Sequence, residues 1–179
     1  MFGIDFGDNE RKLLPDELLV ARRVFGNSIK WWQVRVSDGH GLGDSIFTNA
    51  GIGQDTMHVT KSHYARVPDE VLIHELVHVW QATNLGFTGW GYKANSLLHQ
   101  GYHTLLGHTR NAAYTYNRSR LGKDGFEDFS TEEQAQIVED WFLRGELRTD
   151  PAFRYIHHCI RECDYIGRFL GHVCPPAVV

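Results

Sequence analysis

The amino-acid sequence predicts an α+β fold, mainly helical, with a small β-sheet that precedes a central helix. Three observations carry this prediction. A segment near the N-terminus has a helical pattern, two short segments then alternate apolar and polar residues, and most segments after residue 68 have helical patterns again. The chain has 179 residues, 42% of them hydrophobic, which suits a sizeable core. We therefore expect residues 1–179 to form a single domain.

The first predicted helix spans residues 15–25, PDELLVARRVF. Pro15 is suited to the first turn of a helix, and Gly26 is suited to its end. The apolar stripe of this helix is expected to consist of Leu18, Leu19, Val24 and Phe25.

Two strands are predicted next. Residues 29–36, IKWWQVRV, alternate apolar with polar side chains and are rich in residues that favour strands. Residues 55–61, DTMHVTK, alternate in the same way. Residues 38–45, DGHGLGDS, have the composition of a turn or loop.

The central helix is predicted over residues 68–86, PDEVLIHELVHVWQATNLG. Pro68 suits its first turn, and Asp69 and Glu70 complement the positive end of the helix dipole. Less clear helices follow over residues 96–108 and 111–118.

Residues 130–147 give a clearer helix. It opens with Ser130 or Thr131 followed by Glu133 or Gln134, which resembles a capping box. A last helix is expected over residues 151–170.

Charge and hydropathy exclude some function classes. The net charge is −4 and no long basic run occurs, which argues against nucleic-acid binding. No stretch reaches the roughly 20 apolar residues of a membrane span. The polar, acidic N-terminus does not resemble a signal peptide. We expect a protein that stays in the cytoplasm or is exported without a cleaved signal.

The cysteines do not predict a disulfide framework, because their number is odd. A buried helix face is the favoured interpretation for this region, with a second metal site as the alternative. The residues concerned are Cys159, Cys163, Cys174, His157, His158 and His172.

The central helix contains the pattern H-E-x-x-H. On a helix, His74 and His78 lie one turn apart on the same face, so both imidazoles can bind one ion. Glu75 can then reach a water molecule at that ion. The alternative is a helix that packs in the core, but a buried Glu among apolar residues needs a partner. The pattern predicts a Zn²⁺ site with Glu75 as a catalytic residue.

A catalytic zinc site needs a third protein ligand from elsewhere in the chain. Glu132 and Glu133 open the helix at residues 130–147, and only one of them can point inward. A rival group consists of His99, His103 and His108. Spacing leaves this choice open.

Three segments resemble a known family. LIHELVHVWQ at 72–81, AYTYNRSRLGKDGFEDFSTEEQAQIVEDWF at 113–142 and YIHHCIR at 155–161 are similar to the zincin-type metallopeptidase domain of Vgr-related proteins. Such domains occur on the spikes of bacterial type VI secretion systems or as free-standing effectors. The similarity covers residues 18–165.

The resemblance implies roles for particular residues. Residues 132–142 resemble the family block E-Q-Q-A-x-I-V-x-D-Y-F, which implies that Glu132 is the third zinc ligand of a gluzincin-like site. Glu133 stands where the family usually has Gln and is the fallback ligand. Asp140 could accept a hydrogen bond from a ligand histidine. Tyr114 or Tyr116 could donate a hydrogen bond to a developing oxyanion, and we assign this catalytic role to Tyr116.

The sequence therefore leads to a zinc-dependent peptidase in which Glu75 is the general base. Residues 56–61 are expected to align a peptide or protein substrate by strand pairing. The resemblance implies a secreted bacterial effector, held in the cytoplasm before export, with a secretion-spike protein and an immunity protein as partners. Two alternatives remain: a non-catalytic zinc-binding cargo module, and a zinc amidase acting on the cell wall.

Overall fold

A computed structural model describes residues 8–39, 46–49, 55–84 and 115–161. The N-terminal elements are β1 (Glu10–Arg11), α1 (Pro15–Phe25), β2 (Val34–Ser37), β3 (Phe47–Asn49), β4 (Asp55–His58), α2 (Lys61–Tyr64) and α3 (Asp69–Asn84). The later ones are the 3₁₀ helices η3 (Arg118–Arg120) and η4 (Phe126–Asp128), then α5 (Thr131–Leu143) and the π-helix η5 (Tyr155–Arg161). The predicted α+β class is confirmed. Within the described ranges, no helix has the length and apolar character to cross a membrane.

The four strands form one sheet in the order β1-β2-β4-β3. β4 pairs with β2 in parallel and with β3 in antiparallel fashion, so both of its edges are occupied. The expectation that residues 56–61 pair with a substrate backbone is therefore wrong. The outer strand on this side is β3, where Thr48 lies opposite Met57. This strand was not predicted from the sequence.

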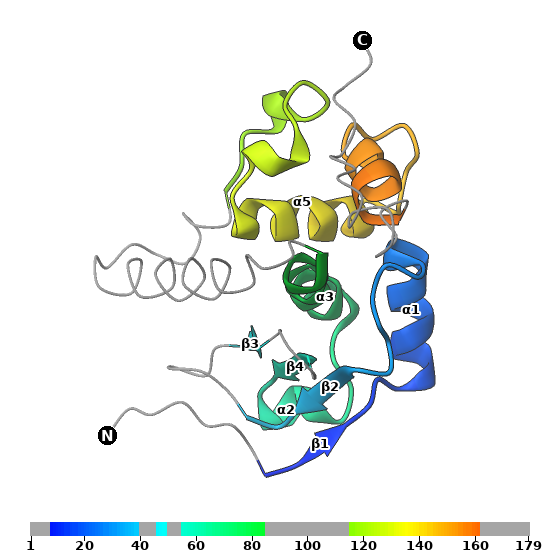
Figure 1. Cartoon of the computed structure of the whole chain (residues 1–179), viewed down its shortest axis with the longest axis vertical. Helices are drawn as coiled ribbons and strands as arrows, with labels where there is room; N and C mark the ends of the chain where they lie inside the picture. The colour runs from blue at the N-terminus through cyan, green and yellow to red at the C-terminus, as the bar shows by residue number, and fades with distance from the viewer. Residues whose placement is uncertain (1–7, 40–45, 50–54, 85–114, 162–179) are drawn as a thin grey trace, which may run out of the picture.

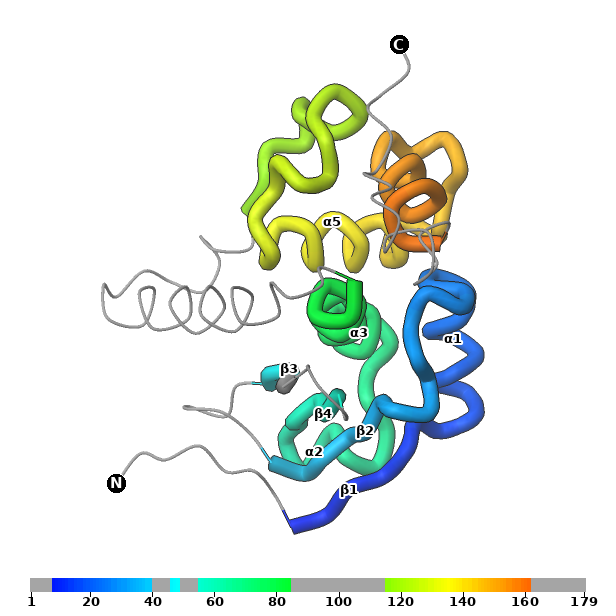
Figure 2. Tube along the Cα trace, in the orientation of Figure 1, coloured from blue at the N-terminus to red at the C-terminus, as the bar shows by residue number. Residues whose placement is uncertain are grey.

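Helix α3 lies at the centre of the molecule. It packs between the sheet on one side and α5 on the other, and α1 lies along its flank (Figure 1). The Cα trace shows that α3 follows directly on the short α2 beside the sheet (Figure 2). Because α3 is covered on several sides, most of its side chains are buried, including Leu72, Ile73, Leu76, Val77 and Val79. Polar residues on such a helix need partners inside the protein.

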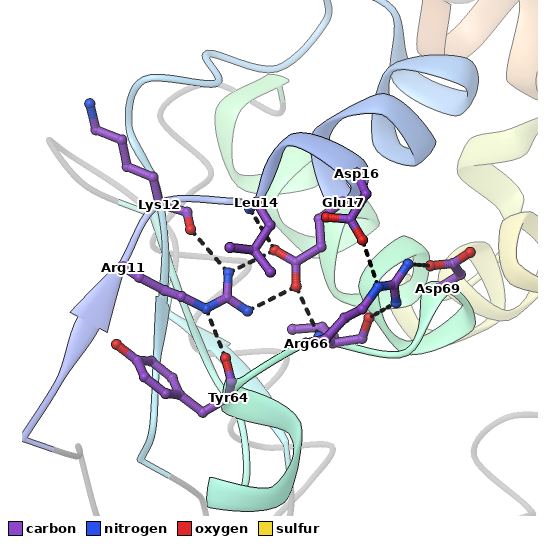
Figure 3. Close-up of polar contacts among 9 residues, drawn as sticks. Arg11, Lys12, Leu14, Asp16, Glu17, Tyr64, Arg66 and Asp69 are labelled. Carbon is purple, nitrogen blue, oxygen red and sulfur yellow. Dashed lines mark hydrogen bonds and ion pairs between the residues drawn. The ribbon is translucent and has the colours of Figure 1, made fainter.

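An ion pair inside the protein fixes the segment that leads into α3 (Figure 3). The guanidinium group of Arg11 donates to both carboxylate oxygens of Glu17, over 2.7 and 2.8 Å. The Glu17 side chain is fully buried, and it also accepts from the backbone N–H groups of Leu14 and Val67. Burial raises the pKa of Glu17, but these hydrogen bonds outweigh it and hold the pKa below its usual value.

A second arginine lies on the surface beside this pair. Arg66 donates to Asp16 of α1 and to Asp69 at the start of α3, both over 2.7 Å (Figure 3). Together the two arginines connect β1, α1 and the entry to α3.

Several predicted boundaries need correction. The strand expected over residues 29–36 begins only at Val34, because the residues before it form a turn in which the Trp31 indole N–H donates to Gly26. Leu19 is 67% exposed and does not belong to the apolar stripe of α1. Helix α5 ends at Leu143. Of the helix expected over residues 151–170, residues 151–152 form a turn and the π-helix η5 makes up most of the described remainder.

The region after α3 is described only in part. The helix expected over residues 96–108 lies outside the described residues, and residues 115–117 of the other expected helix are not helical. Cys159 is buried and disulfide-bonded, so it is not a thiolate ligand and the alternative of a second metal site at this residue is wrong. Cys163 and Cys174 lie outside the described residues.

Candidate metal centre

Two helices bring three predicted ligands together. His74 and His78 come from α3, and Glu132 comes from the first turn of α5, which packs against α3. Ligand atoms of all three lie within 4.8 Å of one another. The three residues are buried, with exposures of 9%, 5% and 6%. The structure thus favours Glu132 as the partner of the two histidines.

The spacing of these atoms fits a metal ion better than direct hydrogen bonds. Oε2 of Glu132 lies 3.5 Å from Nε2 of His74 and 3.5 Å from Nε2 of His78. A good N–H···O bond would be about 2.9 Å long. Two ligands of one tetrahedral zinc, each about 2.1 Å from the ion, are about 3.4 Å apart.

A carboxylate orients the ring of His74. Its Nδ1 lies 2.9 Å from Oε2 of Glu139. An ionised carboxylate only accepts hydrogen bonds, so Nδ1 carries the proton of this contact. Nε2, the nitrogen near Glu132, is then the ring position that a metal ion can take.

An amide orients the ring of His78 in the same sense. Its Nδ1 lies 2.9 Å from Oε1 of Gln81, one turn further along α3. The amide oxygen is an acceptor, so Nδ1 again carries the hydrogen and Nε2 points to Glu132. Both histidines therefore present the same ring nitrogen to the same carboxylate.

The electrostatics of the cluster favour a cation. Burial acts to raise the pKa of Glu132, but the two histidines outweigh it and hold that pKa well below its usual value. Burial alone would lower the pKa of His74; the nearby carboxylates of Glu132 and Glu139 raise it instead, to about 10. The pKa of His78 is also raised, against the effect of burial, by the charge of Glu132. The position between the three groups thus attracts protons or a metal ion.

Glu75 lies in the same environment. It is buried, and its charge contributes to the raised pKa of both His74 and His78. The hydroxyl group of Thr48, on strand β3, donates to Oε2 of Glu75 over 2.7 Å. One carboxylate oxygen is therefore held by the sheet.

Two other predicted residues have hydrogen-bond partners outside the three ligands. Oε2 of Glu133 accepts from the backbone N–H of Ser130, and the Ser130 hydroxyl accepts from the N–H of Glu133. This capping box was predicted, and it gives Glu133 a role at the helix end. The hydroxyl of Tyr116 donates to Asp140 over 2.8 Å. Tyr114 and the rival group His99, His103 and His108 lie outside the described residues.

Two residues that orient the histidines were not predicted from the sequence. The acceptor for His74 is Glu139 and not its neighbour Asp140. Glu139 follows Glu132 by two helical turns and so shares its face, a spacing that could have identified it. Gln81 follows His78 by about one turn and was visible in the same way. No sequence spacing could have identified Thr48, because it lies on a different element and contacts Glu75 only in the folded protein.

Comparison with known proteins adds evidence on the fold. No protein-family profile matches the sequence, and no curated protein sequence does either. Among solved structures, the chain is similar to the effector domain of Pseudomonas aeruginosa VgrG2b, with a TM-score of 0.54 and 23% sequence identity. The alignment covers 83% of this chain and 85% of that one. The chain therefore shares the fold of that effector domain.

Proposed function

We propose that this protein is a zinc-dependent peptidase. The observation that carries the proposal is the convergence of three buried ligand atoms, from His74, His78 and Glu132, next to the carboxylate of Glu75. Two imidazoles and one carboxylate form a ligand set that suits zinc and leaves a coordination position free for water or substrate.

The protein would supply binding, orientation and proton transfer. His74, His78 and Glu132 would hold the ion, while Glu139 and Gln81 keep the two rings oriented. A zinc ion bound here would polarise a scissile carbonyl group and make water more acidic. Glu75 would take the proton of the attacking water and pass it to the leaving amine. Thr48 holds Oε2 of Glu75, so on this proposal the other carboxylate oxygen would carry the transfer.

Tyr116 is proposed as a donor to the oxygen on which negative charge develops. Burial, followed by the hydrogen bond to Asp140, raises the pKa of Tyr116 to about 12, so that it keeps its proton at neutral pH. To act as proposed, the hydroxyl must exchange Asp140 for the substrate. Tyr116→Phe should then lower kcat and leave zinc content unchanged. Unaltered kcat would remove Tyr116 from the mechanism.

A secreted effector is the proposed biological setting. The fold shared with the VgrG2b effector domain supports this role, as does the resemblance of the sequence to Vgr-related proteins. On this proposal the chain leaves the bacterial cytoplasm with a type VI secretion spike, and an immunity protein protects the producing cell.

The test combines metal analysis with one substitution. The purified protein should contain one zinc per chain, and Glu75→Gln should keep that zinc while hydrolysis of a peptide library falls by about 10²–10⁴-fold. Equal hydrolysis by both proteins would contradict the catalytic role of Glu75. Cleavage of peptidoglycan fragments but no peptides would identify an amidase, and zinc without any hydrolysis would favour the cargo module.

A further inference from the structure

Gln81 and Gln134 form a buried chain of amide hydrogen bonds that starts at His78. Oε1 of Gln81 faces Nδ1 of His78 at 2.9 Å, and Nε2 of Gln81 donates to Oε1 of Gln134, also over 2.9 Å. The Gln81 side chain is fully buried and Gln134 is nearly so. Such amides are costly inside a protein unless their polar atoms are paired.

The far end of the chain is fixed by the backbone. Nε2 of Gln134 donates to the carbonyl oxygens of Phe126 and Phe129, over 2.9 and 3.0 Å. Carbonyl oxygens only accept, so a reversed amide would place its own oxygen against both of them. The orientation of Gln134 is therefore determined, and its oxygen must face Gln81.

The orientation of Gln81 follows from this. Its Nε2 donates to Oε1 of Gln134 and to the carbonyl oxygen of Thr131, over 3.0 Å, so both of its N–H groups are used. The amide oxygen of Gln81 therefore faces His78 and accepts a hydrogen bond from an N–H group at Nδ1 of the ring.

We infer that Gln81 and Gln134 are positioning residues that determine which ring nitrogen of His78 binds the metal ion. In this relay, the chain of hydrogen bonds from the carbonyl oxygens of Phe126 and Phe129 through Gln134 and Gln81 to His78, each group determines the orientation of the next. As a result, Nε2 of His78 faces Glu132. Gln81 also donates to the carbonyl oxygen of Thr131, the residue directly before Glu132, and so connects His78 to the start of α5. This inference rests on the metal site of the proposed function.

The two histidines are thus oriented by different chemistry. Glu139 brings a carboxylate to His74, whereas Gln81 brings a neutral amide to His78. The centre already contains the carboxylates of Glu132 and Glu75. A neutral relay fixes the second ring without adding another negative charge to a buried site.

The first test needs only the wild-type protein. Nuclear magnetic resonance of the zinc-loaded, ¹⁵N-histidine-labelled protein distinguishes the two ring nitrogens, and the His78 signals are those absent from His78→Asn. We expect a hydrogen on Nδ1 of His78 and zinc on Nε2. Zinc on Nδ1 of His78 would contradict the positioning role of Gln81 and Gln134 and would leave the proposed zinc site intact. A wild-type protein that takes up no zinc would overturn the proposed function and the inference with it.

Substitutions then separate positioning from structure. Gln81→Leu removes the acceptor and should weaken zinc binding by about 10- to 100-fold. Gln81→Glu keeps an acceptor for Nδ1 of His78, but its second oxygen faces the oxygens of Gln134 and Thr131. This variant should therefore melt at a lower temperature than the wild type and still bind zinc more tightly than Gln81→Leu. The matched control is Gln136→Leu, because Gln136 lies on α5 but bonds Asp140, and it should keep wild-type affinity. Equal zinc affinity of Gln81→Leu and Gln136→Leu, or of the two Gln81 variants, would overturn the inference.

Discussion

At the scale of single residues, the centre is defined by which ring nitrogen of each histidine faces Glu132. Glu139 accepts a hydrogen bond from Nδ1 of His74, and Gln81 accepts one from Nδ1 of His78. Both Nε2 atoms therefore face the same oxygen of Glu132. Three electron-rich atoms in a buried space repel one another unless a proton or a metal ion lies between them. On the proposal of a zinc site, protons and zinc would therefore compete for the same position.

Zinc uptake should release protons. The pKa of His74 is raised to about 10 in the metal-free protein, so at pH 7 its imidazole is protonated and zinc must displace that proton. We expect zinc affinity to increase as the pH rises from about 6 to 8. Isothermal titration calorimetry in two buffers of different ionisation enthalpy measures the number of protons released. An enthalpy that is the same in both buffers would contradict this explanation.

Thr48 should support catalysis without holding the metal. Thr48→Val keeps the branched shape but removes the hydrogen bond to Glu75, a bond to a charged group worth about 1.5–3 kcal/mol. We expect kcat to fall about 10- to 100-fold while KM and zinc content stay constant, and Thr48→Ser to recover most of the loss. A Thr48→Val protein with wild-type kcat would show that the bond does not matter.

At the scale of secondary-structure elements, the position of α3 decides the geometry of the site. The helix carries both histidines and Glu75, and α5 supplies Glu132. At its start, the buried pair of Arg11 and Glu17 holds the entry segment through the N–H of Val67. The elements around α3 thus fix the site from both sides.

Loss of the Glu17 charge should destabilise the fold. Glu17→Gln leaves Arg11 without its buried partner and should lower the free energy of unfolding by about 3–5 kcal/mol at pH 7. Asp16→Asn, on the exposed side of the same helix turn, is the control and should have a small effect. Urea unfolding followed by circular dichroism measures both. Equal midpoints for the two variants would contradict the importance of the buried pair.

The same carboxylate predicts an acid limit to stability. The pKa of Glu17 in the folded protein lies below its unfolded value of 4.5. Its contribution is therefore complete above that value and is lost as the pH falls through the folded pKa. We expect the difference in unfolding free energy between wild type and Glu17→Gln to shrink on acidification. A difference that stays constant down to pH 3 would argue against this linkage.

The sequence predicted those features of the fold and of the site that depend on residues close together in the chain. The helical spacing of His74 and His78, the cap at Ser130 and the helix end at Gly26 were all predicted, because each depends on neighbours in sequence. Strand β3 was missed, since a segment of three residues shows no clear alternation. The contact between Thr48 and Glu75 could not be predicted, because only the pairing of β3 with β4 creates it.

At the scale of the whole molecule, the site connects two parts of the chain. The histidines belong to the helix after the sheet, and Glu132 belongs to the C-terminal helical part, as Figure 1 shows for α3 and α5. An ion bound by both parts stabilises only the folded arrangement. The fold shared with the VgrG2b effector domain covers both parts.

Zinc should therefore raise the melting temperature of the whole protein. At a free zinc concentration 100 times the dissociation constant, binding adds about 2.7 kcal/mol to the free energy of unfolding. Differential scanning calorimetry should show this increase for the wild type and a much smaller one for Glu132→Ala, with Glu133→Ala as the control. An equal increase in wild type and Glu132→Ala would place the zinc elsewhere.

The most direct test of the metal centre is a crystal structure of the zinc-loaded protein, with diffraction measured on both sides of the zinc absorption edge. We predict an anomalous difference peak between α3 and α5, about 2.0–2.2 Å from Nε2 of His74, Nε2 of His78 and a carboxylate oxygen of Glu132. A zinc peak bound by other residues, or no peak at this position in protein that contains zinc, would contradict the account.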